Sequence, residues 1–225
     1  MKTSIIIPVY NEEATIKKVL DVIKAVDLDK EIVIVDDCST DKTRDILKEI
    51  NDPQVRIFYH DKNQGKGAAL RTGFEKATGE IIMVQDADLE YDPREYPHVL
   101  RLIKDGSADV VYGSRFLGDH RVFLFWHYMG NKVLTLITNL LYNTILTDME
   151  TGVKAFRREA IADIKIKSKG FDFEPEITAK ILKKGLRLYE VPITYRGRSY
   201  NEGKKIHWYD GLWALRALIR FRFFD

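Results

Sequence analysis

Two aspartates separated by a single residue are the first candidates for chemistry in this sequence. Asp86 and Asp88 follow closely on the apolar run Ile81–Val84, which predicts a strand buried on both faces. Carboxylates at the carboxyl end of a parallel strand face the crevice where open α/β sheets bind ligands. Their oxygens suit a hard divalent cation that could hold a diphosphate, although the same pair could simply cap the next turn and helix.

Two other predicted strands also run into acidic side chains. The segments Ser4–Val9 and Glu31–Val35 predict buried strands, followed by Glu12 and by the pair Asp36 and Asp37. Acids at several strand ends predict a ligand crevice lined by carboxylates. The sequence contains neither G-x-G-x-x-G nor G-K-[ST], which argues against a dinucleotide oxidoreductase and a P-loop ATPase.

The elements that would position these residues follow a regular alternation. Strand and helix patterns alternate four times over residues 4–84, which is typical of an α/β fold with a mostly parallel sheet, right-handed crossovers and flanking helices. Asn11 is predicted to cap a helix that reaches Val26, and Ser39 or Thr40 to cap the next helix. Gly79 is expected to end a third helix.

Two basic segments could contact phosphates. The turn Gly65-Lys66-Gly67 could present Lys66 and backbone N–H groups to an anion, or could be an ordinary loop. The segment 196–205 carries four cations and two glycines, so it could close on a diphosphate, or could be a solvated surface loop.

Two later segments are unusually apolar. A helix is predicted from Phe125 to Leu146, either as a core helix or as a helix on a membrane surface. The segment 208–224 interleaves aromatic residues with arginines, which suits an interfacial anchor or docking onto the protein's own apolar surface. We therefore expect a domain over residues 1–205 and an amphipathic C-terminal helix over 206–225. Between these segments, Pro192 predicts an edge strand over Leu186–Tyr195.

Composition sets further bounds. The 225 residues are 45% hydrophobic and 31% charged, and the net charge of +2 is too near neutral to imply nucleic acid binding. The single cysteine, Cys38, fits a reducing compartment. The apolar run near Met1 is too short for a signal peptide, and no stretch is long enough to predict a transmembrane helix. A cytoplasmic protein, peripheral at the cytoplasmic face of a membrane, is expected.

Seven motifs in order carry a resemblance to a known family. They are Pro8-Val9-Tyr10-Asn11-Glu12-Glu13, Val35-Asp36-Asp37-Cys38-Ser39-Thr40-Asp41, Asn63-Gln64-Gly65-Lys66-Gly67, Gln85-Asp86-Ala87-Asp88, Gly113-Ser114-Arg115, Thr151-Gly152, and Arg198-x-Tyr200-x-Glu202-x-Lys204. On these residues the chain resembles the family 2 glycosyltransferases of the GT-A fold. It is most similar to their dolichol-phosphate mannose synthase and polyprenyl-phosphate glycosyltransferase branch. The second residue of the family's aspartate-glycine-serine run is Cys38 here.

The resemblance implies roles for individual positions. It implies Mg²⁺ or Mn²⁺ held by Asp86 and Asp88, as well as a nucleotide-sugar site that includes both. The remaining residues of that implied site are Pro8, Tyr10, Glu12, Asp36, Asp37, Lys66, Gln85 and Ala87.

Further residues are implied to act directly in transfer. Arg115 matches a residue that meets the acceptor phosphate, and Arg198 and Lys204 match a mobile basic loop that grips the diphosphate. Glu176 matches an acid near the sugar, with Glu174 as the competing candidate.

The activity implied by the resemblance is an inverting transfer of a hexose from a nucleotide diphosphate sugar to dolichyl or polyprenyl phosphate. Mannose from GDP-mannose is favoured, with UDP-glucose or UDP-N-acetylglucosamine as the alternative. A phosphate nucleophile is already anionic, so no catalytic base with a tuned pKa is required. Three rivals stay open: a glycosyltransferase with a hydroxyl acceptor, a non-enzymatic nucleotide-sugar sensor or scaffold, and, more weakly, a nucleotidyltransferase.

Overall fold

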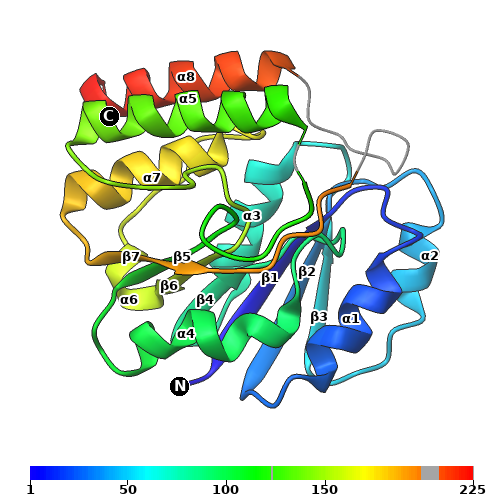
Figure 1. Ribbon diagram of the computed structural model, residues 1–225. Helices are drawn as coiled ribbons and strands as arrows, with labels where there is room; N and C mark the ends of the chain where they lie inside the picture. Colours follow the sequence, from blue (N-terminus) through cyan, green and yellow to red (C-terminus); the bar gives the residue numbers. More distant parts are fainter. Residues whose placement is uncertain (123, 199–207, 225) are drawn as a thin grey trace.

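A seven-stranded sheet forms the centre of the computed structural model, which describes residues 1–122, 124–198 and 208–224 (Figure 1). The strand order is β3-β2-β1-β4-β6-β5-β7. Neighbouring strands are parallel except where β6 pairs with β4 and β5. The strands are β1 (Thr3–Val9), β2 (Lys30–Asp36), β3 (Val55–Tyr59), β4 (Ile81–Val84), β5 (Val110–Ser114), β6 (Lys154–Arg157) and β7 (Leu188–Pro192). The expected α/β architecture with a mostly parallel sheet is confirmed.

The burial of the strands follows their sequence patterns. Every residue of β2 and β4 is buried, as expected for central strands covered on both faces. β3 and β7 are the two edge strands and are partly exposed. Pro192 lies at the end of β7, so the predicted edge position of this strand is confirmed.

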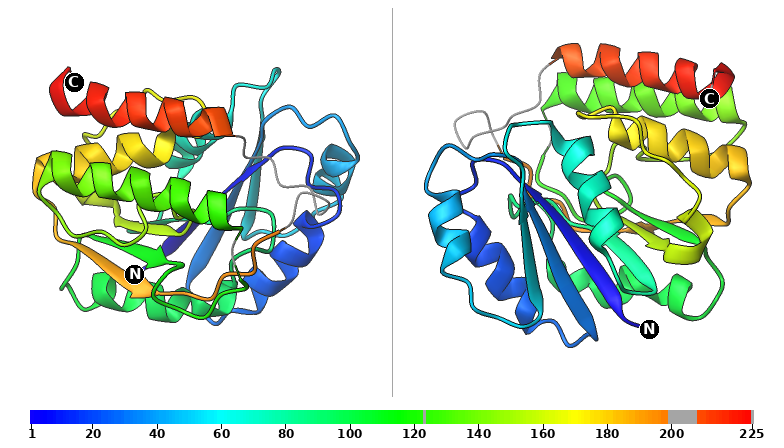
Figure 2. Two further views of the ribbon diagram at one scale, coloured as in Figure 1. Left: turned by 45° about the horizontal axis from the view of Figure 1, so that its top comes forward. Right: turned by 180° about the vertical axis from the view of Figure 1, so that it is seen from behind.

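The helices cover the sheet on both faces, and a further pair forms an outer layer (Figures 1 and 2). One face carries α1 (Ile16–Ala25), α2 (Thr43–Lys48), the 3₁₀ turn η1 (Pro93–Glu95) and α4 (Tyr96–Lys104). The other carries α3 (Lys66–Lys76), α6 (Arg158–Ile161) and α7 (Phe173–Lys184). The outer pair, α5 (Phe125–Tyr142) and α8 (Trp208–Phe223), lies side by side over α7.

Three predicted helix caps are wrong. α1 begins at Ile16, and Asn11 instead has a φ of 52° while its side chain bonds Thr40 across the loop. Neither Ser39 nor Thr40 caps α2, which begins at Thr43. The hydroxyl of Ser39 accepts the Asn11 N–H instead. In both loops, hydrogen bonds between the ends of β1 and β2 compete successfully with local capping.

Gly79 does not end α3, which stops at Lys76. Its role is close packing, because a Cβ there would lie 2.7 Å from the Lys2 carbonyl oxygen and the Ser4 nitrogen. The glycine therefore lets the chain pass β1 as it enters β4.

The two apolar helices, α5 and α8, each have an inner face that packs and an outer face that is exposed. α8 buries Ala214, Ala217, Leu218 and Phe221 against α5 and α7. The α5 helix fully buries only polar residues among its described side chains, and Trp126 is 81% exposed. It lies in the outer layer, with Leu134, Ile137 and Leu141 partly buried against a small hydrophobic cluster. It also ends at Tyr142, because Asn143 adopts a left-handed conformation.

Across the three described segments, no helix combines the length and apolar character that crossing a bilayer requires.

Candidate active site

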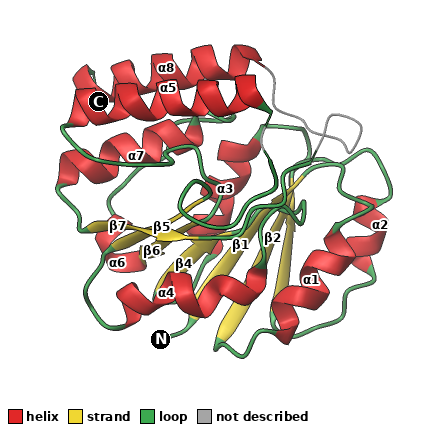
Figure 3. Ribbon diagram, in the orientation of Figure 1, coloured by secondary structure: helices red, strands yellow, loops and turns green. Residues whose placement is uncertain are grey.

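The carboxyl ends of β1, β2 and β4 bring the sequence-predicted acids to one edge of the sheet. These strands are adjacent and parallel, so the loops that follow them gather at the same edge (Figure 3). Glu12, Asp37, Asp86 and Asp88 all lie in these loops. The N-terminus of α3, with Lys66, joins them through an ion pair with Asp86.

Asp36 and Asp37 shape the side of the site nearest β2. Asp36 is fully buried and accepts a hydrogen bond of 2.6 Å from Nε of Arg44. Asp37 accepts the backbone N–H groups of Gln64 and Gly65 at 2.9 and 2.6 Å. Both carboxylates therefore fix the loops around the pocket predicted for the base and ribose. On β1, Pro8 pairs in register with Val35, and the nearby Tyr10 is 38% exposed.

His60 belongs to this side of the site, although the sequence analysis did not select it. Its Nδ1 lies 2.7 Å from Oδ1 of Asp37, and its Nε2 lies 3.0 Å from the Thr72 hydroxyl. A lone histidine after a strand carries no sequence signal for this contact.

Lys66 connects two carboxylates from distant parts of the chain. Its Nζ lies 2.8 Å from Oδ1 of Asp86 and 2.9 Å from Oε1 of Glu174. Burial alone would lower the pKa of Lys66, but the two carboxylates raise it well above its usual value. Gly65 has a φ of 93°, and a Cβ there would lie 2.4 Å from the Lys169 carbonyl oxygen. Gly65 therefore allows the backbone conformation and close packing that place Lys66 beside Asp86.

Arg198 is held by three carboxylates. Its guanidinium nitrogens lie 3.1 Å from Asp88, 3.5 Å from Glu12 and 3.5 Å from Glu90. Glu90 also accepts the Arg198 backbone N–H and the Tyr195 hydroxyl, so it fixes the segment that follows β7. The sequence analysis did not select Glu90.

Charge is crowded around Asp88. Burial, together with repulsion from Asp86 and Glu90, raises the pKa of Asp88 to about 7 in spite of Arg198. Lys204, the second predicted cation of this loop, lies outside the described residues.

Arg115 is buried beside the site and fixed by Asp148. Its Nε and one terminal nitrogen each lie 2.7 Å from a carboxylate oxygen of Asp148. The guanidinium also lies 5.3 Å from the centre of the Tyr195 ring. Any anion would therefore have to meet the N–H groups that Asp148 leaves open.

The structure brings Glu174, rather than Glu176, to Lys66 and Asp86. Glu176 is fully buried and accepts the backbone N–H groups of Lys167 and Ser168. It therefore fixes the loop before α7. Glu174, two residues earlier, contacts Lys66 directly.

Gln85 and Ala87 support the turn that carries the two aspartates. Gln85 is fully buried, donates to the Asp86 carbonyl oxygen and accepts the Tyr96 hydroxyl. The Ala87 side chain belongs to the hydrophobic core.

A divalent cation fits the charge of this edge. No group of three or more His, Cys, Asp or Glu side chains with metal-binding geometry occurs among the described residues, so the predicted pair Asp86 and Asp88 would need oxygen ligands from elsewhere. Hard carboxylate oxygens are nevertheless the donors that Mg²⁺ and Mn²⁺ prefer. The acids here, Glu12, Asp86, Asp88, Glu90 and Glu174, outnumber the cations Lys66 and Arg198.

Comparison with known proteins identifies the family. Residues 4–165 match the model of Glycosyl transferase family 2, which is more than half of the chain. The chain belongs to this family. The family expected from the seven motifs is confirmed.

Relatives with assigned names are about one third identical to the chain over the aligned residues. The low-salt glycan biosynthesis hexosyltransferase Agl6 of Haloferax volcanii is 32% identical over 201 residues, covering 87% of this chain and 48% of the relative. The dolichol-phosphate mannosyltransferase of Pyrococcus furiosus is 32% identical over 220 residues, covering 93% and 62%. The chain thus spans about half to three fifths of the length of these relatives.

A solved structure confirms the GT-A-like fold. Glucosyl-3-phosphoglycerate synthase from Mycobacterium tuberculosis, in complex with Mn²⁺, UDP and glucosyl-3-phosphoglycerate, superposes with a TM-score of 0.76. The identity is 21%, and the match covers 98% of this chain and 79% of that one.

The family match covers only part of the candidate site. Residues 4–165 include Asp86, Asp88 and Arg115, but Glu174 and Arg198 lie beyond them. Their place in the site rests on the ion pairs with Lys66 and Asp88.

Proposed function

We propose that this family 2 glycosyltransferase transfers a hexose, with inversion, from a nucleotide diphosphate sugar to dolichyl or polyprenyl phosphate. The observation that carries the proposal is the edge where Asp86 and Asp88 face Lys66 and Arg198. This arrangement supplies oxygen ligands for a cation and two positive side chains for a diphosphate. The named dolichol-phosphate relative supports the acceptor class.

The donor would lie across the ends of β2, β1 and β4. In the proposed site, Tyr10, Glu12 and Asp37 border the base and ribose, and Asp36 keeps Asp37 in place. Mg²⁺ or Mn²⁺ bound by Asp86 and Asp88 would neutralise charge on the diphosphate leaving group. Lys66 and Arg198 would stabilise the same developing charge, since preorganised cations act most strongly in a partly buried site.

The acceptor phosphate would enter on the side of Arg115, whereas Lys204 of the basic loop would join Arg198 at the diphosphate. A phosphate oxygen is anionic at neutral pH, so attack requires alignment and reduced repulsion rather than a general base. Direct in-line attack inverts the anomeric carbon. The sequence-derived role of Glu176 near the sugar becomes indirect in this proposal, because Glu174 makes the contact with Lys66.

The favoured donor is GDP-mannose, on the strength of the mannosyltransferase relative. UDP-glucose or UDP-N-acetylglucosamine is the alternative, and the solved structural neighbour is one that binds UDP.

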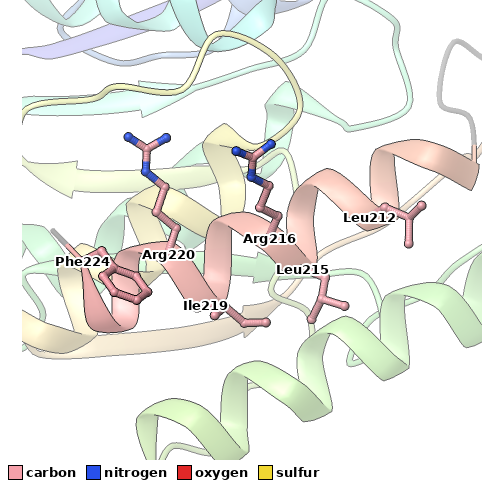
Figure 4. A pocket seen from close by; sticks show the side chains of 6 residues that line it. All are labelled: Leu212, Leu215, Arg216, Ile219, Arg220 and Phe224. Carbon is pink, nitrogen blue, oxygen red and sulfur yellow. The ribbon is translucent and has the colours of Figure 1, made fainter.

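The outer helices α5 and α8 support a peripheral position at the cytoplasmic face of a membrane. An open groove of about 600 Å³ on α8 is lined by Leu212, Leu215, Arg216, Ile219, Arg220 and Phe224. Figure 4 shows Arg216 and Arg220 projecting on one side of the helix, away from Leu215 and Ile219. Apolar side chains beside arginines suit the boundary between acyl chains and anionic headgroups. We assign residues 1–205 to catalysis and 206–225 to this contact.

Two measurements test the proposed function. The first is a thermal-shift panel of GDP, UDP and their sugars with and without Mn²⁺, because a ligand that binds only the folded chain raises its unfolding temperature. The second is transfer of labelled hexose to a polyprenyl phosphate in detergent. Metal-dependent stabilisation by one base, followed by labelled lipid, is the expected result. Transfer to a sugar hydroxyl but not to lipid would refute the acceptor, and binding without any turnover would favour a sensor or scaffold.

A further inference from the structure

Two buried carboxylate oxygens beside the site lack a donor. Oε1 of Glu150 and Oε2 of Glu174 are buried and have no hydrogen-bond partner among residues 1–122, 124–198 and 208–224. Buried polar atoms in folded proteins are nearly always hydrogen-bonded, so each exception calls for an explanation. Two such acceptors near one another are typical of a binding site in which the hydroxyl groups of a ligand supply the missing hydrogen bonds.

The ammonium group of Lys66 connects Glu174 to Asp86, one of the predicted metal ligands. Its other oxygen, Oε1, lies 2.9 Å from Nζ of Lys66, which lies 2.8 Å from Asp86. The free oxygen of Glu174 therefore belongs to the same cluster as the proposed diphosphate site.

The loop that carries Glu150 is pressed against Asp86. A Cβ at Gly152 would lie 2.2 Å from Oδ2 of Asp86, so only glycine allows this approach. The Gly152 N–H donates to the Tyr91 hydroxyl, which holds the loop from the other side. Glu150 stands two residues before this contact.

Lys154 holds the backbone of the same loop. Its buried ammonium donates to the carbonyl oxygens of Met149 and Thr151, on either side of Glu150. Burial and the neighbouring Glu174 carboxylate raise the pKa of Glu150 to about 8. The backbone on both sides of Glu150 is thus held in place.

The strand order places these carboxyls where the sugar of a donor would follow its diphosphate. The proposed base and ribose lie over β2 and β1, and the diphosphate lies over β4. The next strand is β6, which begins at Lys154, with Glu150 just ahead of it. A donor laid along this direction brings its hexose to Glu150 and Glu174.

We propose that Glu150 and Glu174 bind the hexose of the donor, with Oε1 of Glu150 and Oε2 of Glu174 accepting hydrogen bonds from its ring hydroxyl groups. The inference rests on the proposed function, because the site receives a hexose only if the chain binds a nucleotide sugar. It adds a sugar-selecting role for Glu150, which none of the seven motifs contains.

The test compares the nucleotide with the nucleotide sugar in one variant. Calorimetry with Mn²⁺ measures the affinity of wild type and Glu150→Gln for GDP and GDP-mannose, or for UDP, UDP-glucose and UDP-N-acetylglucosamine if uridine binds. We expect Glu150→Gln to keep its affinity for the nucleoside diphosphate within twofold and to bind the sugar conjugate about tenfold or more weakly. Glu159→Gln on α6, whose side chain is 79% exposed, is the control and should match wild type.

The outcomes separate the two proposals. If wild type binds no nucleoside diphosphate, the proposed function fails, and this inference fails with it. If wild type binds the diphosphate but Glu150→Gln loses none of the affinity added by the sugar, the inference alone is refuted. An equal loss for diphosphate and conjugate would also refute it, since Glu150 would then hold the loop rather than the sugar. A donor lacking one ring hydroxyl should lose affinity in wild type but not further in Glu150→Gln.

Discussion

Asp86 and Asp88 stand two residues apart, yet different cations neutralise them. Asp86 pairs with Lys66, which is buried at the start of α3. Asp88 pairs with Arg198, at the end of the described segment that follows β7. At the scale of single residues, we expect the buried pair of Asp86 and Lys66 to shape the site. We expect the pair of Asp88 and Arg198 to rearrange when a ligand binds.

Replacing Asp88 by Asn tests the metal and diphosphate assignment. We expect Asp88→Asn to lower hexose transfer by about 100-fold or more and to abolish Mn²⁺-dependent stabilisation by the nucleotide. The unfolding temperature without ligand should be maintained or rise, because the repulsion from Asp86 and Glu90 is removed. Asp21→Asn, at an exposed position of α1, is the control. Transfer within twofold of wild type would remove the metal from the proposed mechanism.

Arg198 is expected to contribute through a charge-assisted contact with phosphate. Arg198→Ala should reduce kcat/KM by about 100-fold, and Arg198→Lys should recover only part of this loss, because lysine lacks the forked donor geometry. Steady-state kinetics with purified donor and lipid acceptor measure both. Arg196→Ala, at an exposed side chain two residues earlier, should stay within a few-fold of wild type. Similar losses in both arginine variants would indicate a general charge effect.

The acids that the sequence missed or ranked second share one property. Glu90 and Glu174 acquire their partners from distant segments, as in the contact between Lys66 and Glu174. Local patterns select residues at strand ends, so Asp86, Asp88 and Lys66 could be found. They do not say which of two glutamates on one helix turns towards the site, which is why Glu176 was named ahead of Glu174.

At the scale of elements, hydrogen bonds between loops decide where the helices begin. Asn11 has the residue type of a helix cap, but its side chain bonds Thr40 in the loop after β2. Strands were predicted more accurately than helix ends, because burial on both faces leaves a continuous apolar run. The predicted strands Ser4–Val9 and Glu31–Val35 match β1 and β2 to within one residue at each end.

At the opposite edge of the sheet, Glu31 joins β1, β2 and the chain before β4. Its carboxylate accepts the Ser4 hydroxyl at 2.5 Å and the Thr78 N–H at 2.6 Å, and it also pairs with Lys2 and Arg56. Burial would raise the pKa of Glu31, but these hydrogen bonds lower it to about 2. The ionised form therefore stabilises the folded state.

This contribution has a defined pH dependence. Because the folded-state pKa is depressed, the stabilisation is present above the unfolded-state value near 4.5 and is lost as pH falls towards 2. Glu31→Gln should lower the free energy of unfolding by about 2 kcal/mol at pH 7, and its difference from wild type should shrink steadily below pH 5. Urea titrations of both proteins at several pH values measure this. A difference that does not change with pH would assign the effect to packing.

At the scale of the whole molecule, the chain places its reactive edge and its apolar layer in separate elements. The acids follow β1, β2 and β4, whereas α5 and α8 lie outside α7. The sequence indicated both apolar segments but left open whether each was buried. The structure shows that α8 buries one face and exposes the other. The sequence alone could not predict this, because it depends on the helices against which α8 packs. Leu218 is fully buried, while Trp213 is 55% exposed.

The outer helices α5 and α8 and the chain end carry large apolar side chains that are open to solvent. Trp126, Leu140 and Phe224 are 81%, 75% and 79% exposed, so replacing them by Ser should leave the unfolding temperature near that of wild type. The triple variant should bind vesicles containing anionic lipid at least about tenfold more weakly, since each large apolar side chain moved from water into the interface contributes about 1.5–3 kcal/mol at most. Tyr59→Ser with Tyr189→Ser, on the edge strands, is the matched control.

Charge and apolar contact can be separated on the same surface. Arg216→Gln with Arg220→Gln should weaken binding to anionic vesicles and leave binding to neutral vesicles nearly unchanged, because arginines near a charged surface contribute through its potential. Added salt should reduce binding of wild type more than that of this variant. If wild type and the serine variant bind all vesicles equally, α5 and α8 do not form the membrane contact. Transfer to a short-chain, water-soluble prenyl phosphate should then proceed equally well in both proteins, and the acceptor would reach Arg115 without help from these helices.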